Sequence, residues 1–333
     1  MLPSSTCTAL RWRALQPLKR AVSYVRCAST ASKQQQQLLP YHVSSSSSPT
    51  FKRLLALSKQ SRDCSPPASL LVEGRTLIQH VASSPWQLAR LILTERTLNK
   101  ELERHSSGDA NLLQLLSHST DLTASQPLQL TATLARRLSH ATTPSEYVAE
   151  FNLPAAAVVQ SPLSADMLVV DGVSDPTNLA SLVRSAHAFG FRQLALRQNS
   201  CSPYSHKVVA GSAGSIAYVG VHKWDEALER ELESGRAHGR VCVIGLVASA
   251  GKPLRVVAER VRRRREVGAA VWLVVGNESR GMSEDMLEQC DELCTIPMTQ
   301  EVESLNAAAA ASIACYELGS GASAESQDRA SKR

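Results

Sequence analysis

Residues 271–283 read Val-Trp-Leu-Val-Val-Gly-Asn-Glu-Ser-Arg-Gly-Met-Ser. The first five form a continuous apolar run, which is typical of a parallel strand covered on both faces. Gly276 and Gly281 bracket the polar loop that follows, and Gly276 would let a ligand approach the backbone closely. Glu278 thus stands just beyond the carboxyl end of a buried strand, where open α/β sheets bind their ligands. We therefore expect a ligand site at this loop, against the alternative of a turn with a solvated glutamate.

The chain around this loop alternates between strand-like and helix-like stretches. Strands are expected at 167–170, 193–196, 216–221, 241–247, 271–275 and 293–296, and helices at 179–189, 205–210, 224–233, 283–289 and 305–318. This rhythm predicts the α/β class, with a parallel sheet covered by helices on both faces. The loop has neither the G-x-G-x-x-G spacing nor a Walker lysine, which disfavours nicotinamide and nucleoside-triphosphate binding.

Two further segments place polar residues between an expected strand and an expected helix. DPTNLASLVRSAHAFG begins at Asp175 and holds Asn178 near the helix start, with Arg184 six residues later. IPMTQEVESLN ends at Asn306 and includes Ser304, just before an Ala-rich helix. Taken singly, each pattern is also that of an ordinary helix cap, and Arg184 of a solvated helix charge.

Together the three segments resemble the SpoU (TrmH-type) family of RNA ribose 2′-O-methyltransferases within the SPOUT superfamily. The resemblance covers roughly residues 165–320. It implies a C-terminal SPOUT domain with a parallel sheet and a deep trefoil knot, a rare topology that periodicity does not reveal. Residues 69–158, with their Val-Glu-Gly start, resemble the small α/β ribosomal-protein-like domain with which many members bind substrate RNA.

The resemblance also implies a site, a cofactor and a partner. The active-site pattern of the family is matched by Asn178, Arg184, Glu278, Ser304 and Asn306. The methyl donor would be S-adenosylmethionine, with no metal, held by Gly276, Ile296 and Leu305, with Leu246 lining the same cleft. Members act as homodimers in which the partner subunit completes the site. Ala180 and His187 depart from the family pattern, but neither position carries a reacting group.

The chemistry sets its own demands on these residues. In-line methyl transfer needs the ribose hydroxyl aligned about 3 Å from the methyl carbon, and the hydroxyl must lose its proton. A guanidinium with a pKa above about 12 resists the role of base. We therefore interpret Arg184 as a fork that grips a phosphate and stabilises the forming alkoxide. Glu278 is expected to hold Arg184 or Asn306 in place, and Asn178 to orient the nucleotide.

Charge divides the chain into a basic start and an acidic body. Ten of the 36 Lys and Arg residues precede Asp63, which is the first of the 30 Asp and Glu residues. An acid-free, Arg- and Ser-rich start is typical of an organelle transit peptide, so residues 1–62 are expected to be a disordered leader that directs the protein to the mitochondrial matrix. A basic arm that contacts nucleic acid is the alternative. Residues 321–333 are expected to form a loose tail.

Composition narrows the remaining function classes. Aromatic residues make up 4% of the chain, which disfavours a broad base-stacking platform, and no apolar run approaches the roughly 18 residues of a membrane-spanning helix. The eight cysteines have no C-x-x-C spacing, which disfavours a zinc site and favours reduced thiols. RNA contact should be local, at Arg260 with Arg262–Arg265 or at Arg136 with Arg137; a solvated helix end explains the first cluster equally well.

These observations predict S-adenosylmethionine-dependent 2′-O-methylation of a ribose in RNA. The two-domain layout favours mitochondrial large-subunit ribosomal RNA, at a guanosine, and transfer RNA is the alternative substrate. A catalytically silent RNA-binding or ribosome-assembly factor on the same fold is the alternative from another class. Methyl incorporation into RNA discriminates between the enzyme and the silent factor.

Overall fold

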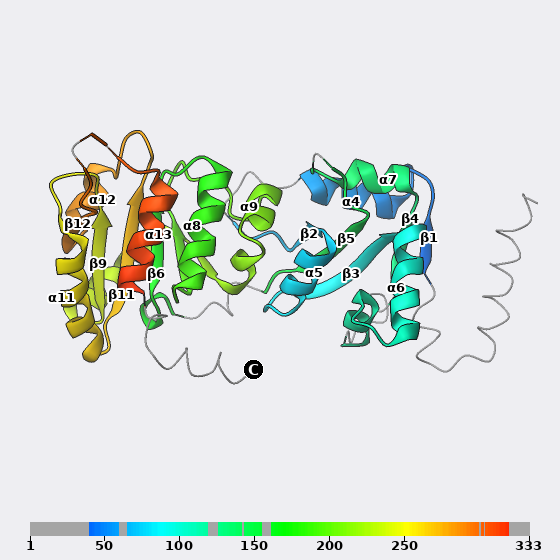
Figure 1. The fold of residues 1–333 in the computed structure, drawn as a ribbon, viewed down its shortest axis with the longest axis horizontal. Helices are drawn as coiled ribbons and strands as arrows, with labels where there is room; N and C mark the ends of the chain where they lie inside the picture. The colour runs from blue at the N-terminus through cyan, green and yellow to red at the C-terminus, as the bar shows by residue number, and fades with distance from the viewer. Residues whose placement is uncertain are drawn as a thin grey trace, which may run out of the picture.

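The computed structural model describes residues 40–59, 65–118, 126–141, 143–154, 161–299, 301–302 and 304–319. These residues form two α/β units, each built on its own sheet (Figure 1). The tail expected at 321–333 and most of the expected leader lie outside the described residues. No helix within the described ranges is long and apolar enough to cross a membrane.

The C-terminal unit contains, within the described residues, a seven-stranded sheet in the order β10-β12-β9-β11-β6-β7-β8. Every neighbouring pair is parallel, which confirms the predicted parallel sheet. The strands are β6 (Met167–Asp171), β7 (Gln193–Leu196), β8 (Gly220–Lys223), β9 (Val241–Leu246), β10 (Lys252–Pro253), β11 (Ala270–Gly276) and β12 (Glu292–Thr295).

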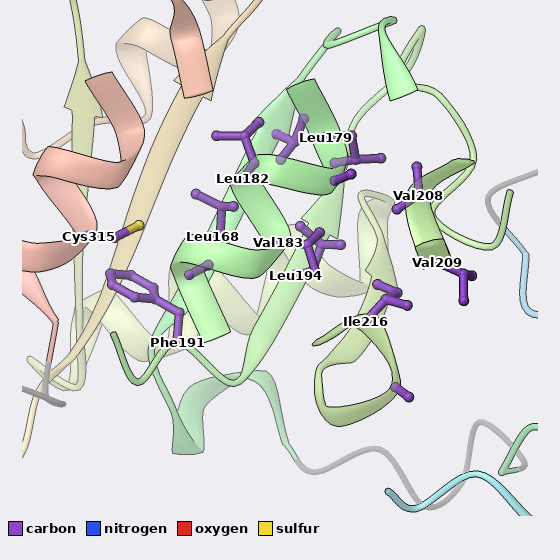
Figure 2. Close-up of a cluster of buried hydrophobic side chains, with 14 of the residues drawn as sticks. Leu168, Leu179, Leu182, Val183, Phe191, Leu194, Val208, Val209, Ile216 and Cys315 are labelled. Atoms are coloured by element: carbon purple, nitrogen blue, oxygen red, sulfur yellow. The ribbon is translucent and has the colours of Figure 1, made fainter. Parts of the chain in front are cut away.

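Helices cover both faces of this sheet. They are α8 (Pro176–Ala188), α9 (His206–Gly211), α10 (Glu226–Ala237), α11 (Leu254–Glu266), α12 (Glu284–Glu288) and α13 (Ala307–Leu318), with 3-10 turns η3 (Pro162–Ser164) and η4 (Ser215–Tyr218). Side chains alternate across a strand, so Leu168 of β6 packs in the core cluster with α8 and α13 while Val169 packs in the cluster with α10. Figure 2 shows the first cluster, where Leu182, Phe191 and Cys315 gather above the sheet.

Two expectations for this unit were wrong or incomplete. The strand expected at 216–221 begins only at Gly220, because residues 215–218 turn as η4 after Gly214, which adopts a left-handed backbone at φ 81°. Helix α11 was expected only as one of two readings of its arginine cluster, a solvated helix end. Its buried residues Leu254, Val257, Ala258 and Val261 follow helical spacing, but six arginines among its 13 residues mask that pattern.

The N-terminal unit contains, among the described residues, a five-stranded mixed sheet in the order β1-β4-β3-β5-β2. Strand β5 runs antiparallel to β2 and β3, and the other pairs are parallel. The elements are β1 (Tyr41–Val43), α4 (Pro49–Lys59), β2 (Ser69–Glu73), α5 (Arg75–Ala82), β3 (Gln87–Thr94), α6 (Glu95–Ser107), η1 (Leu112–His118), β4 (Leu128–Leu130), α7 (Ala132–Leu138) and β5 (Tyr147–Asn152).

The structure corrects the start of this unit. Strand β1 pairs with β4, and Phe51 and Leu54 of α4 are completely buried. Arg53 donates two hydrogen bonds of 2.7 and 2.5 Å to the buried carboxylate of Glu150. Residues 41–59 therefore belong to the folded unit, and the expected leader boundary at residue 62 was wrong. Missing acidic residues indicate low negative charge, but they do not exclude a helix with an apolar face.

The two units pack against each other through α9 and η4. A Cβ on Gly214 would lie 2.9 Å from the side chain of Val81 on α5, so the glycine permits this close approach. The Tyr218 hydroxyl donates a 2.7 Å hydrogen bond to the backbone carbonyl of His80. Buried residues of both units consequently belong to one continuous core cluster.

We expect Phe51→Ala to lower the free energy of unfolding by about 3–5 kcal/mol, because it empties a filled core position. The exposed neighbour provides a control, since Lys52→Ala should change stability by less than about 0.5 kcal/mol. Urea denaturation followed by circular dichroism measures both. Equal stability of the two variants would mean that α4 does not belong to the folded unit.

Candidate active site

Three of the four expected cofactor-binding residues lie at or just beyond the carboxyl ends of three adjacent strands, and the fourth, Leu305, directly precedes the N-cap of α13. Leu246 at the end of β9 is in register with Val275 of β11 and Cys294 of β12. Gly276 follows Val275, and Ile296 lies two residues beyond Cys294. The side chains of Leu246 and Ile296 are half-buried and pack against the main core cluster. The strand ends thus present apolar surface at one edge of the sheet.

Three of the five expected active-site residues form a hydrogen-bonded chain at this edge. The amide nitrogen of Asn306 donates to the amide oxygen of Asn178 over 3.2 Å. The amide nitrogen of Asn178 in turn donates to Glu278 Oε1 over 2.6 Å. The structure therefore joins the start of α8 to the loop after β11, 100 residues later in the sequence, and to the start of α13, 128 residues later.

A helix cap fixes the direction of this chain. Asn306 is the N-cap of α13, and its Oδ1 accepts hydrogen bonds from the backbone N–H groups of Ala308 and Ala309 over 2.9 and 3.3 Å. Since the oxygen faces these donors, only the amide nitrogen of Asn306 remains to meet Asn178. Asn178 must then accept with its oxygen and donate with its nitrogen, so a carboxylate such as Glu278 is a fitting last member.

The loop that carries Glu278 folds back tightly on its own strand. A Cβ on Gly276 would lie 2.4 Å from backbone atoms of Gly281 and Met282, so only glycine fits. The side chain of Asn277 donates to the carbonyl of Gly172 over 2.8 Å, tying the loop to the end of β6. Glycine at this position therefore makes room for its own loop, and the expected cofactor contact of Gly276 stays a prediction.

Sequence reasoning missed a second set of residues, centred on Arg197, that holds the same loop. Its guanidinium donates to Asp171 Oδ1 over 3.2 Å, to Ser283 Oγ over 2.5 Å and to Asp285. Ser283 donates its backbone N–H and hydroxyl to Asp171 Oδ2 over 2.8 and 2.7 Å. The hydrogen bond from Arg197 lowers the pKa of Asp285. Asp171 and Arg197 lie at the carboxyl ends of neighbouring strands, a position that could have singled them out.

Arg184 and Ser304 do not join the hydrogen-bonded chain. Both are exposed, and within the described residues neither has an ion pair or a side-chain hydrogen bond. Arg184 lies six residues after Asn178 on α8, about 120° away around the helix axis. The expected contact of Glu278 with Arg184 is absent from the described residues, and Glu278 reaches Asn306 only through Asn178.

The two departures from the family pattern have local explanations. Gly211 on α9 packs against Ala180, since a Cβ on Gly211 would lie 2.8 Å from the Ala180 methyl group. His187 stacks on the ring of Tyr218 at a centroid distance of 5.1 Å, and its partial burial lowers its pKa. Both residues pack α8 against α9 and η4, away from the chain that ends at Glu278.

Comparisons with known proteins agree with this geometry. Residues 166–316 match the model of the SpoU rRNA Methylase family. An uncharacterized tRNA/rRNA methyltransferase of Mycobacterium tuberculosis (strain ATCC 25177 / H37Ra) is 35% identical over 53% of this chain and 51% of its own length. The chain thus spans about half the length of the curated relatives it matches first.

Solved structures resemble both units of the fold. The SpoU methyltransferase AviRb from Streptomyces viridochromogenes, in complex with AdoMet, has a TM-score of 0.63 at 22% identity, over 85% of this chain and all of the other. An AdoMet-bound rRNA methyltransferase from Sinorhizobium meliloti has a TM-score of 0.62 at 18% identity, over 85% of this chain and 97% of the other. At 22% and 18% sequence identity, these similarities show a shared fold.

We expect Arg197→Met to lower the free energy of unfolding by about 3 kcal/mol, because it leaves the buried Asp171 carboxylate without its cation. Asp285 is the matched control, since its side chain is 62% exposed and Asp285→Asn should cost less than about 1 kcal/mol. Urea denaturation of both variants tests this. A loss in Arg197→Met no larger than in Asp285→Asn would show that the guanidinium does not hold the loop.

Proposed function

Because residues 166–316 match the model of the SpoU rRNA Methylase family, we propose that the protein methylates the 2′-hydroxyl of a ribose in RNA, with S-adenosylmethionine as the methyl donor. The observation that carries this proposal is the oriented chain Asn306–Asn178–Glu278 beside apolar strand ends. The two-unit layout favours large-subunit ribosomal RNA, at a guanosine, over transfer RNA. The acid-free start of the chain favours the mitochondrial matrix.

The strand ends fit the proposed cofactor. Leu246 and Ile296 supply half-buried apolar side chains at or just beyond the ends of β9 and β12, as cofactor pockets require, and the half-buried Leu305 directly precedes the N-cap of α13. The cofactor supplies an electrophilic methyl group when it is bound. We also propose the family's trefoil knot, since α13, the helix that follows β12 in the chain, packs beside α8 and α11 and contacts β11 and β9.

The polar chain has unused groups that suit a ribose. Each amide nitrogen carries two hydrogens, and within the described residues Asn178 and Asn306 each donate one side-chain hydrogen bond. The second carboxylate oxygen of Glu278 likewise has no hydrogen-bond partner in the described part of the chain. Two donors and one acceptor therefore remain to orient the sugar hydroxyls. Because the chain is already fixed by the helix cap, orienting the substrate needs little further ordering.

Arg184 provides the positive charge that the hydrogen-bonded residues Asn306, Asn178 and Glu278 lack. Its guanidinium can grip the target phosphate through two parallel N–H groups and stabilise the forming alkoxide. A non-bridging oxygen of the same phosphate then takes the proton of the hydroxyl, since a guanidinium does not act as a base. This division of roles leaves binding and orientation to Asn178, Glu278 and Asn306.

A homodimer explains why Arg184 does not join the hydrogen-bonded residues Asn306, Asn178 and Glu278 of its own subunit. Ile313 and Tyr316 expose 41% and 57% of their surface on α13, and with Ala309 they form an apolar stripe at helical spacing. Arg184 lies beside α13, since its neighbour Ser185 is hydrogen-bonded to Ser312 of that helix over 2.7 Å. We propose that this stripe packs against a second copy and that Arg184 completes the partner's site.

Incubation with labelled S-adenosylmethionine and ribosomal RNA tests the reaction itself. We expect label in alkali-resistant dinucleotides, which identify 2′-O-methylated ribose. Label in the base fraction would contradict ribose specificity. Cofactor binding without any label in RNA would support the catalytically silent factor instead.

Arg184→Lys tests the role of the guanidinium. A lysine keeps the positive charge but loses the fork, so we expect the methyl-transfer rate to fall by about 100-fold or more. The affinity for S-adenosylmethionine should be unchanged, because the guanidinium does not hold the cofactor. Single-turnover kinetics and calorimetric titration measure the two quantities. A rate close to that of the unmodified protein would refute the fork.

Mixed dimers test the proposed sharing of sites. Arg184→Lys and Asn178→Ala should each be inactive, but a mixture of the two, exchanged between subunits, should regain about a quarter of the normal activity, because one site in each mixed dimer is intact. Methyl incorporation before and after subunit exchange measures this. A mixture no more active than its components would place both residues of a site in the same subunit.

A further inference from the structure

One face of the N-terminal sheet is covered by helices without acidic residues. Helix α4 carries Lys52, Arg53 and Lys59, and α7 carries Arg136 and Arg137, yet neither helix contains an Asp or Glu. The two helices share a core cluster and pack together. Helix α6 belongs to the core cluster on the other face, and it mixes acidic with basic residues. Positive charge is thus concentrated on one face, although residues 40–333 as a whole contain 30 Lys and Arg against 30 Asp and Glu.

Part of this positive charge has no ion-pair partner within the described residues. Arg53 is engaged with Glu150, and the Arg137 guanidinium lies 5.4 Å from the centre of the Phe51 ring. Lys52, Lys59 and Arg136 are exposed and have no ion pair within the described residues. On α4 the two lysines are seven residues apart and therefore share one side of the helix.

Contacts lead from these helices to the start of α8. The His140 ring, just after α7, contacts the carbonyl of Ser58 at the end of α4, and it lies 5.6 Å from the ring of His206 on α9. Lys207 follows, exposed, on α9, which packs against α8. Asp175 is the N-cap of α8, three residues before Asn178. Figure 1 shows α4, α7, α9 and the start of α8 along the same side of the molecule.

The carboxylate buried at this junction does not cancel the positive charge outside. Glu73 is 9% exposed. It accepts hydrogen bonds from the Ser139 hydroxyl over 2.5 Å and from the His140 backbone N–H over 3.0 Å. The His206 ring is a third partner, with its Nε2 3.4 Å from Glu73 Oε1. The carboxylate therefore faces the seam between the units, and Lys59 and Lys207 remain exposed to solvent.

The larger arginine cluster, Arg262–Arg265, lies at the opposite end of the strands from the candidate active site. Helix α11 leads through residues 267–269 into β11, so Arg262–Arg265 lie at the amino end of that strand. Glu278 follows its carboxyl end. Seven strand residues at about 3.3 Å each separate the two ends by roughly 20 Å.

Part of the arginine cluster is also neutralised. Arg265 donates over 2.6 Å both to the buried Asp166 and to the carbonyl of Leu318. Arg260 pairs with Glu292 at 2.9 Å. These bonds tie α11 to the sheet and to α13, so they serve packing.

We propose that substrate RNA, beyond the nucleotide that is methylated, lies along a basic track formed by Lys52, Lys59, Arg136 and Lys207. The inference rests on the proposed function, since it takes the RNA that enters the site as its ligand. Lysine and arginine contacts to phosphates position a nucleic acid without reading its sequence. The track therefore sets the register in which the target ribose reaches Asn178, and it leaves the choice of nucleotide to the site.

Salt titration of RNA binding tests the track in the full chain. The probe is a fluorescein-labelled hairpin RNA of mixed sequence, with its affinity measured over a series of KCl concentrations. The variant combines Lys59→Gln, Arg136→Gln and Lys207→Gln. Each lost phosphate contact reduces the slope of log affinity against log salt by about 0.7–0.9, so we expect a reduction of about 2.

The matched control combines Arg262→Gln, Arg263→Gln and Arg264→Gln, which removes the same charge from the opposite edge. It should leave the slope unchanged. Circular dichroism and S-adenosylmethionine titration should be the same for both triple variants, and ultraviolet cross-linking of the unmodified protein should yield RNA-linked peptides from α4, α7 or α9.

A track variant with the unmodified slope, or cross-links confined to α11 or to residues 1–39, would overturn the track. The proposed function fails separately: a reduced slope in the track variant, together with no methyl incorporation into any RNA, would retain the track and reject the methyltransferase.

Discussion

The hydrogen-bonded chain from Asn306 through Asn178 to Glu278 is the interaction on which the site depends. It begins at a helix cap, where two backbone N–H groups of α13 fix the orientation of one amide. That orientation passes through the second amide to the carboxylate, because each amide has one accepting and one donating end. A single local structure, the start of α13, thus determines the pattern of donors and acceptors that three distant segments present to a substrate.

The remainder of the C-terminal unit holds the end of this chain in place. Glycine at position 276 lets the loop fold onto its own strand, and Asn277 ties the loop to the end of β6. Arg197 links the end of β7 to the residues after the loop through Asp171 and Ser283. Stability and positioning therefore depend on the same contacts, as expected for a site whose geometry is preorganised on strand ends.

Part of this arrangement could be predicted from local sequence pattern, since continuous apolar runs identified the strands around β6 and β11. The meeting of Asn178, Glu278 and Asn306 was expected from the resemblance of the three segments to the SpoU family, because each segment taken singly is also an ordinary helix cap or turn. What could not be predicted depends on three-dimensional context. The side of α8 that bears Arg184 is set by how the helix packs, and the burial of α4 is set by apolar residues within a basic segment. The role of Gly276 also became clear only from the atoms that a Cβ would meet.

The central claim is that Asn178 and Glu278 act as one unit in methyl transfer, and a double-mutant cycle tests it most directly. Single-turnover rates are needed for Asn178→Ala, Glu278→Ala and the combination of both. The account predicts that the double variant is little slower than the slower single variant, with a coupling free energy well above about 0.5 kcal/mol. Losses that add to within about 0.5 kcal/mol would contradict it, since independent residues add in this way.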